Sequence, residues 1–341
     1  MKALVYNGPF DMTIEEIERP EPKENEVQIK VRAVGLCGSD IHGFSGKTGR
    51  RYPGMVMGHE ISGEIWETGS NANKFKKGQK VVVQPIISCK TCLLCREGKN
   101  SICLNKKMVG VNMDKNGGFS EFIIVPEENV FPIPEDLPFS LGALVEPFAV
   151  AASAVRHAEL KKESTLLITG AGVIGISILL LSREKGLKKI FVTDRIPNKL
   201  EAVKTFGGIP LNFTEVDPIA VIKKETSDLG VDCSIEAVGL SASVQTAQLS
   251  VRPGGRIVWV GNSQKIIELD MQDIVVFAKS IQGVYCYSDE DFNTAIDFID
   301  NNREIVSGLV EKEVTFEETT ELFTKLARGE IELFRGVTVF E

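Results

Sequence analysis

The stretch Ser164–Leu181, STLLITGAGVIGISILLL, decides the fold of half the chain. Its apolar start, Ser164–Thr169, predicts a strand, and Val173–Lys185 predicts a helix. The turn between them matches the pattern G-x-G-x-x-G in the strand–turn–helix context that the pattern requires. The first glycine permits a tight turn, the second lets a pyrophosphate approach the backbone, and the third lets helix and strand pack closely. The stretch predicts a dinucleotide-binding loop with the contact residues Gly170, Gly172, Val173, Ile174 and Gly175.

An acidic residue follows this loop at the spacing that dinucleotide binding requires. The next predicted strand, Lys189–Asp194, ends on a carboxylate about 20 residues after Gly175. A carboxylate there accepts hydrogen bonds from the adenosine ribose hydroxyls and repels a 2′-phosphate, which favours NAD over NADP. The adjacent Arg195 keeps NADP open, because an arginine can hold that phosphate. The alternative is that the glycines only shape a turn and Asp194 is a solvated cap.

From about residue 144 onward, short apolar segments alternate with helical patterns. Strands without a polar face are typical of a parallel sheet that helices cover on both sides. The expected elements are strands Ser164–Thr169, Lys189–Asp194, Val231–Glu236 and Gly255–Val260, and helices Val173–Lys185, Lys199–Phe206 and Ala242–Leu249. The second half therefore predicts an α/β domain, a Rossmann doubly wound parallel sheet.

Residues 1–145 are β-rich, with β-branched runs separated by turn residues. The expected strands are Lys2–Tyr6, Glu26–Val34, Glu60–Thr68, Lys80–Gln84 and Ser120–Pro126. The tail from Ser288 holds two helical patterns and a final strand, Gly336–Phe340. The chain thus predicts a β-rich domain beside the dinucleotide-binding domain.

Four of the seven cysteines lie close together in the sequence with the spacing C-x2-C-x2-C-x7-C. Four thiolates at this spacing can close a tetrahedral structural zinc site without an open position. The segment has little apolar sequence of its own, so a metal would hold it together. The alternatives are an iron–sulfur cluster, whose ferredoxin spacings differ, and disulfides, which a cytoplasmic chain disfavours. The predicted zinc ligands are Cys89, Cys92, Cys95 and Cys103.

A second set of metal-ligating residue types is dispersed along the chain. Cys37 follows a predicted strand, His59 and Glu60 come about twenty residues later, and Glu146 precedes the nucleotide-binding half. Cysteine, histidine and carboxylate ligands with one open position are what a catalytic zinc ion needs. Each residue alone is more often structural, and spacing alone does not show that they meet in space.

Length and composition set limits on the function. A chain of 341 residues suggests two domains, and 43% hydrophobic with 25% charged residues is ordinary for a soluble protein. The net charge of −8 argues against nucleic acid or an anionic membrane as partner. We find no apolar run of the roughly 18 residues that cross a membrane, and no signal-peptide pattern in MKALVYNGPF. We therefore expect a cytoplasmic protein.

Together these motifs resemble the zinc-containing medium-chain alcohol and polyol dehydrogenases over essentially the whole chain. The matching motifs are Cys37-Gly-Ser-Asp40, Gly58-His-Glu60, the four cysteines, Gly117-Gly-Phe-Ser-Glu121, Glu146-Pro147 and Gly170–Gly175. The resemblance implies a GroES-like catalytic domain, residues 1–148 and 288–341, around a Rossmann NAD-binding domain, residues 149–287. It also implies an active site in the cleft between them.

The resemblance implies roles for individual residues of the dispersed set. Cys37 and His59 resemble catalytic zinc ligands, and Asp40 resembles the residue that orients the histidine. The third ligand is a cysteine in the alcohol-dehydrogenase branch, whereas Glu146 stands here. That difference points to the polyol, threonine and sugar-acid branches, in which Glu60 can also bind the metal. Both carboxylates therefore stay candidate ligands.

The resemblance also implies a proton path and further cofactor contacts. Ser39 is similar to the hydroxyl that takes the alcohol proton, and His42 to the group that passes it to solvent. Alternatively, Ser39 is a turn residue, His42 is a surface histidine, and water near Glu60 or Glu146 accepts the proton. The further candidate cofactor residues are Arg195, Lys199, Val238, Gly239, Val260 and Gly261.

The substrate class is less sharply defined by the sequence. Lys47, Arg50 and Arg51 lie in the loop that borders the active site in this family, where bases attract a carboxylate or phosphate. The alternative is a solvated basic loop. Tyr287 ends a stretch similar to one in polyol dehydrogenases, but Cys286 stands where those have an arginine. Other segments look most like bacterial aldonate dehydrogenases.

We therefore expect a zinc-dependent oxidoreductase that transfers a hydride from a secondary alcohol of a sugar acid or sugar alcohol to NAD. The alternatives are a dehydrogenase of a phosphorylated polyol, a zinc-free quinone reductase and a non-catalytic dinucleotide-binding relative. The resemblance implies a homodimer or homotetramer. The apolar run Ile274–Phe277 beside Gly283–Tyr287 is a candidate edge for such contacts.

Overall fold

The loop Gly170–Gly175 lies in one of two units into which the chain divides. The computed structural model describes residues 1–113 and 116–341. Unit 1 comprises Met1–Glu146 and Phe292–Glu341, and unit 2 comprises Pro147–Asp291. The predicted domains divide after residues 148 and 287, whereas the units divide after residues 146 and 291. Unit 1 is therefore built from both ends of the chain.

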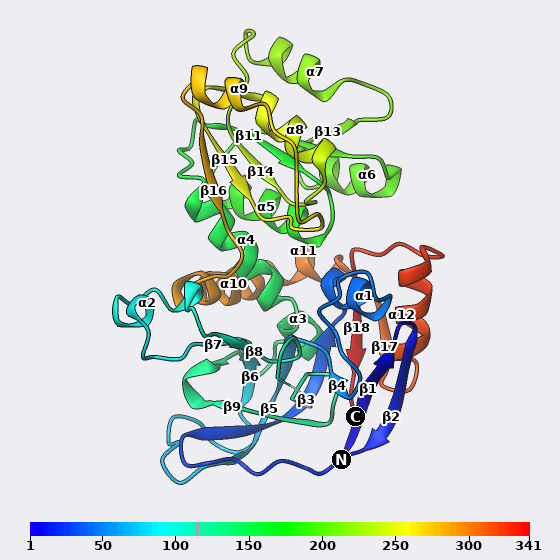
Figure 1. The fold of residues 1–341 in the computed structure, drawn as a ribbon. Coiled ribbons are helices and arrows are strands. Elements are labelled where there is room, and N and C mark those ends of the chain that lie inside the picture. The colour runs from blue at the N-terminus through cyan, green and yellow to red at the C-terminus, as the bar shows by residue number, and fades with distance from the viewer. Residues whose placement is uncertain (114–115) are drawn as a thin grey trace. The chain divides into compact units, whose positions relative to one another are not determined.

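Unit 2 is built on a six-stranded parallel sheet (Figure 1). The strand order β13-β12-β11-β14-β15-β16 is the 3-2-1-4-5-6 order of a doubly wound dinucleotide-binding sheet. The strands are β11 (Thr165–Thr169), β12 (Lys189–Asp194), β13 (Ile209–Asn212), β14 (Val231–Glu236), β15 (Val251–Trp259) and β16 (Ser280–Gly283). This topology confirms the predicted α/β fold.

Helices connect the parallel strands, and buried aliphatic residues of the strands pack against them. The helices are α5 (Val173–Glu184), α6 (Pro197–Thr205), α7 (Pro218–Glu225), α8 (Ser241–Leu249) and α9 (Met271–Val276). Helix α8 packs on β11, β14 and β15, while α6 packs on β12 and β13. The sequence analysis did not predict β13, α7, α9 or β16.

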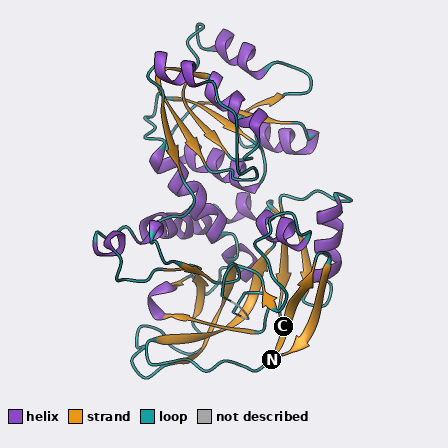
Figure 2. Cartoon of the chain, viewed as in Figure 1, coloured by secondary structure: helices purple, strands orange, loops and turns teal. Residues whose placement is uncertain are grey.

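Unit 1 is mainly β-structure (Figure 2). Its largest sheet has the order β10-β6-β5-β3-β18-β17, with β9 also paired to β3, and β2-β1-β4 forms a second sheet. The strands are β1 (Lys2–Gly8), β2 (Asp11–Glu16), β3 (Glu26–Gly35), β4 (Met55–Val56), β5 (Glu60–Thr68), β6 (Lys80–Val83), β7 (Ile86–Ile87), β8 (Lys107–Met108), β9 (Phe122–Pro126), β10 (Val130–Pro132), β17 (Val310–Thr315) and β18 (Arg335–Val339). The C-terminal β18 pairs with β3, which brings the end of the chain beside residues 33–35.

Short helices lie between these strands. The chain passes from one unit to the other within two longer helices, α4 and α10. The helices are α1 (Gly38–Phe44), α2 (Leu93–Arg96), α3 (Phe139–Gly142), α4 (Val145–His157), α10 (Asp289–Asn301), α11 (Arg303–Ser307) and α12 (Thr319–Arg328). The tail thus holds three helices, and not the two that the sequence analysis expected.

One helical stretch corrects the expectation that no segment is long and apolar enough to span a membrane. Helices α3 and α4 together form Phe139–His157, 19 residues with a mean hydropathy of 1.3. The sequence analysis missed it because Glu146 and Pro147 interrupt the apolar run. Its most apolar window is 78% buried, as in the core helix of a soluble protein. The stretch is therefore weak evidence for a membrane span.

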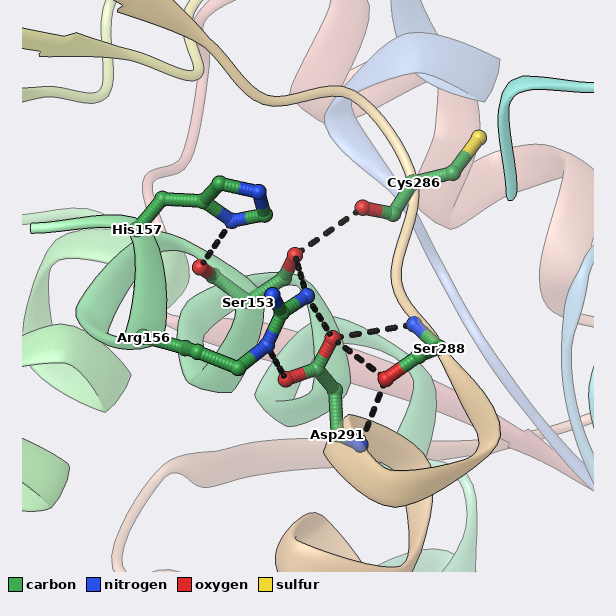
Figure 3. Close-up of polar contacts among 6 residues, drawn as sticks. All are labelled: Ser153, Arg156, His157, Cys286, Ser288 and Asp291. Carbon is green, nitrogen blue, oxygen red and sulfur yellow. Dashed lines mark hydrogen bonds and ion pairs between the residues drawn. The ribbon is translucent and has the colours of Figure 1, made fainter. Parts of the chain in front are cut away.

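Within unit 2, the end of α4 is bonded to the segment that begins α10 (Figure 3). The buried Asp291 carboxylate accepts hydrogen bonds from Arg156 Nε and Nη2, both at 2.8 Å. It also accepts from Ser288 N at 2.9 Å, while Ser288 Oγ accepts from Asp291 N at 3.2 Å. These reciprocal bonds cap the N-terminus of α10. Ser153 Oγ adds a bond to the Cys286 carbonyl at 3.1 Å.

Candidate functional site

The register of two strands brings three metal-ligating residue types together in unit 1. Strands β3 and β5 pair so that Gly35 lies opposite Glu60. Cys37 lies two residues after the end of β3 and directly precedes α1, while His59 directly precedes Glu60. A Cβ on Gly35 would lie 2.0 Å from Glu60 Oε2, so a glycine there leaves room for the carboxylate. The antiparallel register therefore supplies the contact that the sequence spacing did not show.

The three side chains form a group whose geometry fits a metal ion. One ligand atom each from Cys37, His59 and Glu60 lies within 4.8 Å of the others. His59 and Glu60 are buried, whereas Cys37 is half-buried. A thiolate, an imidazole and a carboxylate are the donors that zinc takes in catalytic sites with three protein ligands and one open position. The group can therefore hold a zinc ion.

The side chain of Asp40 fixes the orientation of the His59 ring. Asp40 is fully buried on α1, and its Oδ2 lies 3.1 Å from His59 Nδ1. A carboxylate at Nδ1 leaves Nε2 as the ring nitrogen for a metal. Burial disfavours the charged ring, but Asp40 and then Cys37 outweigh it and raise the pKa of His59 well above its ordinary value. Because a ligand histidine must be neutral, a metal bound here would displace a proton from the ring.

A buried arginine holds the carboxylate of Asp40 from its other side. Arg51 Nη2 donates to Asp40 Oδ1 at 2.7 Å, and the arginine side chain is only 4% exposed. Burial raises the pKa of Asp40, but the charges of His59 and Arg51 outweigh it and lower the pKa below its usual value. Asp40 is therefore held as a carboxylate.

The carboxylate of Glu60 has a buried arginine partner from the far end of the chain. Arg335 Nη1 lies 3.0 Å from Glu60 Oε2 and also donates to the Leu36 carbonyl at 2.7 Å. Burial raises the pKa of Glu60 above its usual value, and the charge of Arg335 opposes this rise. Sequence reasoning missed Arg335, because only the pairing of β18 with β3 brings it here.

Glu146, the other predicted carboxylate ligand, lies in the first turn of α4 and is buried. In the part of the chain that the structure describes, it is not a member of the close group of Cys37, His59 and Glu60. Of the two predicted carboxylate ligands, the geometry therefore favours Glu60.

The two residues of the predicted proton path lie one helical turn apart on α1. Ser39 is exposed, and its Oγ donates to Cys37 Sγ at 3.3 Å. His42 lies three positions further along the same helix face. The residue as a whole is exposed, although part of its ring is buried. Burial of its ring and then the nearby charge of Lys47 lower the pKa of His42. The ring is therefore neutral at pH 7 and able to accept a proton.

The four predicted substrate residues lie in different surroundings. Lys47 and Arg50 are exposed, as anion-binding residues would be. Arg51 is buried against Asp40 and is no longer available to an anion in solution. Tyr287 is buried within unit 2. The basic loop thus divides into an exposed part and a buried part.

The four clustered cysteines have the sulfur spacing of a zinc site. Cys92 Sγ lies 3.5 Å from Cys95 Sγ and 3.9 Å from Cys103 Sγ, and Cys89 Sγ lies 4.0 Å from Cys95 Sγ. A tetrahedron with zinc–sulfur bonds of about 2.3 Å has edges of about 3.8 Å, whereas a disulfide bond is about 2.05 Å. The cysteines are free thiols in the structure. This spacing fits the predicted structural site.

In unit 2, the glycine-rich loop has the conformation and open space that a pyrophosphate needs. Gly170 has φ +96°, and a Cβ on Gly175 would lie 1.9 Å from the Gly170 carbonyl oxygen. Gly172 directly precedes α5, and a Cβ there would meet no heavy atom within 4 Å. The second glycine is thus the open position, at the N-terminus of a twelve-residue helix.

Asp194 is fixed beside this loop by backbone donors. Its Oδ2 accepts from Ala171 N at 2.8 Å, and its Oδ1 accepts from Arg195 N at 2.7 Å and Ile196 N at 3.1 Å. The side chain of Arg195 is exposed, and Lys199 is half-buried on α6. The carboxylate therefore lies beside the loop that precedes α5, and it keeps lone pairs for further donors.

A buried glutamate shapes the two loops at the ends of β14 and β15. Glu236 Oε1 accepts from Val238 N at 2.9 Å, Gly239 N at 2.8 Å and Ser243 Oγ at 2.6 Å. The Glu236 carbonyl accepts from Val260 N at 2.8 Å. Gly261 lies so close to Gly239 N that a Cβ would be 2.2 Å away. The predicted cofactor residues of both loops thus lie together, and the glutamate that holds them was not predicted as a site residue.

Comparisons with known proteins agree with this combination of sites. Residues 23–135 match the alcohol dehydrogenase GroES-like domain, and residues 173–301 match the zinc-binding dehydrogenase domain. The chain is 34% identical to sorbitol dehydrogenase of Bacillus subtilis over 94% of its length and 91% of the relative. It is 29% identical to L-galactonate-5-dehydrogenase of Escherichia coli over 100% of its length and 99% of the relative.

A solved structure shows the same architecture. Galactitol-1-phosphate dehydrogenase from Escherichia coli matches with a TM-score of 0.92 and 26% identity, and 100% of each chain is covered. Zinc and a nicotinamide dinucleotide are the cofactors typical of such dehydrogenases. The chain belongs to the zinc-containing medium-chain alcohol and polyol dehydrogenases, as an enzyme with a GroES-like and a Rossmann domain.

Proposed function

We propose that this enzyme oxidises a secondary alcohol of a sugar acid or sugar alcohol to a ketone and transfers the hydride to NAD. The observation that carries the proposal is the group of Cys37, His59 and Glu60, with ligand atoms within 4.8 Å of one another. A cysteine, a histidine and a carboxylate with an open position suit an alcohol oxygen as the additional ligand.

In this proposal Cys37, His59 and Glu60 hold zinc, and Glu146 is the alternative carboxylate. A zinc ion in such a site lowers the pKa of a bound hydroxyl group and stabilises the negative charge that develops on its oxygen. Asp40 keeps the His59 ring in one orientation, since its Oδ2 lies 3.1 Å from Nδ1. The four cysteines Cys89, Cys92, Cys95 and Cys103 hold a second, structural zinc.

The alcohol proton leaves through residues of α1. Ser39 is exposed beside Cys37, and it accepts the proton of the substrate hydroxyl as it gives its own proton to His42. His42 passes it to solvent, because its lowered pKa keeps the ring neutral and able to accept a proton at pH 7. Replacing His42 with Gln should therefore reduce the rate most below the pH at which wild type is half-maximal. An unchanged pH profile would instead favour a proton path through water near Glu60.

The cofactor is NAD, bound by the glycine-rich loop and Asp194. Backbone amides before α5 face the pyrophosphate, and Gly172 leaves the approach open. The Asp194 carboxylate accepts hydrogen bonds from the ribose hydroxyls and repels a 2′-phosphate. Lys199 and the loops Val238–Gly239 and Val260–Gly261 complete the proposed contacts.

The substrate is an anion recognised by the exposed bases Lys47 and Arg50. Recognition by these bases favours a sugar acid, or the alternative phosphorylated polyol, over a neutral polyol as the substrate. The relatives named above include one of each kind, so the family alone does not choose among them. Tyr287 is a further proposed substrate residue.

A substrate panel tests the proposal directly. Zinc-loaded protein is assayed for NADH formation with sorbitol, xylitol and galactitol, with aldonates, and with polyol phosphates, each with NAD and NADP. Arg50→Ala should raise the KM of an anionic substrate far more than that of a neutral one. An equal rise in the KM of anionic and neutral substrates would contradict anion recognition by Arg50. A preference of the wild-type enzyme for neutral polyols would indicate that the basic loop is only a solvated surface.

The same proposal includes a cytoplasmic homodimer or homotetramer. Strand β16 ends the six-stranded sheet, and Val275, Val276 and Phe277 beside it are exposed. Exposed apolar side chains next to an open sheet edge favour a second copy of the chain as the partner. Sedimentation of wild type and Val276→Lys tests this, because the lysine should produce monomers.

A further inference from the structure

Two adjacent arginines of the basic loop have opposite surroundings. Arg50 is exposed, whereas the side chain of Arg51 is 4% exposed and its Nη2 donates to Asp40 Oδ1 at 2.7 Å. Exposed arginines are common on protein surfaces, but a buried guanidinium needs a partner and a function in the fold. The difference in burial indicates that these neighbours do different work.

The fold makes a defined space for the Arg51 side chain. Gly43 lies on α1, three residues after Asp40, and a Cβ there would be 2.6 Å from Arg51 Cγ and 3.1 Å from Nε. The charge of Arg51 also acts on the buried Tyr6, whose pKa burial raises and Arg51 lowers. The arginine side chain therefore lies against α1, and the absence of a side chain on Gly43 gives it the room.

The carboxylate of Asp40 is divided between two partners. Oδ1 accepts from Arg51, while Oδ2 lies against Nδ1 of His59. A carboxylate group is planar and rigid, so fixing one oxygen fixes the direction of the other. Arg51 thus acts on the histidine ring through one intervening residue.

We propose that Arg51 is a positioning residue of the metal site, which holds Asp40 so that His59 presents Nε2 to the metal. This inference rests on the proposed function, since it takes Cys37, His59 and Glu60 as the zinc ligands. It gives Arg51 a role distinct from the anion recognition proposed for Lys47 and Arg50. Outer partners of ligating histidines affect metal affinity by roughly 10–100-fold, which sets the scale of the effect.

The experiment measures zinc retention, with Arg50→Met as the matched control for Arg51→Met. Each zinc-loaded protein is mixed with a chromogenic chelator, and the release of its two zinc ions is followed. In Arg51→Met the catalytic zinc should bind roughly tenfold more weakly, while the four-cysteine zinc is retained as in wild type. Arg50→Met should retain both ions, and Arg51→Lys should restore part of the lost affinity, because it keeps one charged donor.

A second variant reaches the same contact without removing a charge. Gly43→Ala places a methyl group where the Arg51 stem lies, so it should displace the guanidinium and weaken catalytic zinc similarly. In the double variant with Arg51→Met, the alanine should add little, because the displaced group is already absent. If Arg51→Met does not fold, the single variants Gly43→Ala and Arg51→Lys still test the inference.

The outcomes separate the two proposals. The proposed metal site itself is overturned if the wild-type protein binds only the structural zinc. It is also overturned if Cys37→Ser still binds the catalytic zinc tightly. Wild type with two zinc ions and unchanged retention in Arg51→Met or Gly43→Ala overturns the positioning role alone. With zinc restored, Arg51→Met should lower kcat/KM equally for neutral and anionic substrates. A loss confined to anionic substrates would return Arg51 to the recognition role of Arg50.

Discussion

Buried carboxylates occur in both units, but their surroundings differ. In unit 2, Glu236 and Asp291 accept hydrogen bonds from backbone amides, hydroxyl groups and, for Asp291, a guanidinium. In unit 1, Asp40 and Glu60 lie among charged side chains. Asp40 Oδ2 lies 3.1 Å from His59 Nδ1 and Glu60 Oε2 lies 3.0 Å from Arg335 Nη1, so both oxygens face charged partners without a well-formed hydrogen bond.

The difference separates carboxylates that hold the backbone from carboxylates prepared for a ligand. A buried polar group without a hydrogen bond costs free energy, so native proteins leave few of them. Here a thiol, an imidazole and the Glu60 carboxylate gather with ligand atoms within 4.8 Å of one another, and a bound cation would offset the negative charge of Glu60 and of a Cys37 thiolate. The unit 2 carboxylates need no such group, because their donors are already in place.

The largest expected effect tests the ligand side of this comparison. Cys37→Ser removes the thiolate that accepts from Ser39. We expect kcat/KM to fall by more than about 10³-fold, since loss of a ligand should exceed the 10–100-fold effect of outer partners. The unfolding midpoint of the zinc-free protein should barely change, because serine keeps a polar group of similar size at this half-buried position. A variant with wild-type activity would remove Cys37 from the catalytic site.

The next effect tests the structural side. Glu236→Leu removes the carboxylate oxygen that accepts from Val238 N, Gly239 N and Ser243 Oγ, and it fills a similar volume without an acceptor. We expect the free energy of unfolding to fall by about 2–4 kcal/mol, the cost of unsatisfied buried donors. Urea denaturation measures it, with Glu201→Leu on the exposed side of α6 as control. Equal stability of both variants would contradict the assignment of Glu236 as a backbone anchor.

Asp194 lies between the two classes, because backbone amides hold it while lone pairs remain for a ligand. In Asp194→Ala we expect the KM of NAD to rise roughly 10–100-fold, as for lost hydrogen bonds to a charged group. The KM of NADP should rise less, because repulsion of the 2′-phosphate also disappears. Steady-state kinetics with both cofactors decides this. An equal loss for both would mean that Asp194 serves only to hold the loop at Ala171.

Part of this architecture could be predicted from the sequence, and the reason is local. The glycine-rich loop and the four clustered cysteines have spacings set by nearby backbone geometry, so their residue types and positions indicate the structure directly. The predicted strands Lys189–Asp194 and Val231–Glu236 match β12 and β14. In contrast, β13 and β16 have only four residues each, too few for a periodic pattern.

The supporting residues of the site could not be predicted, because long-range pairing places them. Arg335 reaches Glu60 only through the register of β18 with β3. Arg51 looks like its neighbour Arg50 in the sequence, and only the fold, which places it against Asp40 and Gly43, shows that it is buried. Sequence motifs therefore indicated the candidate ligands, whereas the network that orients them required the fold.

The smallest expected effect concerns the helix cap in unit 2 (Figure 3). Burial raises the pKa of Asp291, but the bonds from Arg156 and Ser288 outweigh it and lower the pKa. A lowered pKa means that the carboxylate stabilises the folded state above its unfolded pKa of about 3.9. This contribution is lost as the pH falls through the folded pKa.

Asp291→Asn should therefore cost about 1–2 kcal/mol of unfolding free energy at pH 7. Its stability should also fall less steeply than that of wild type as the pH drops from about 5 to 3. Chemical denaturation across this range measures both effects, with the exposed Asp297→Asn on the same helix as control. Because Asp291 already has its donors, catalytic zinc should be retained as in wild type. Loss of zinc in Asp291→Asn would show that the two classes of buried carboxylate are coupled, and the contrast between the units would fail.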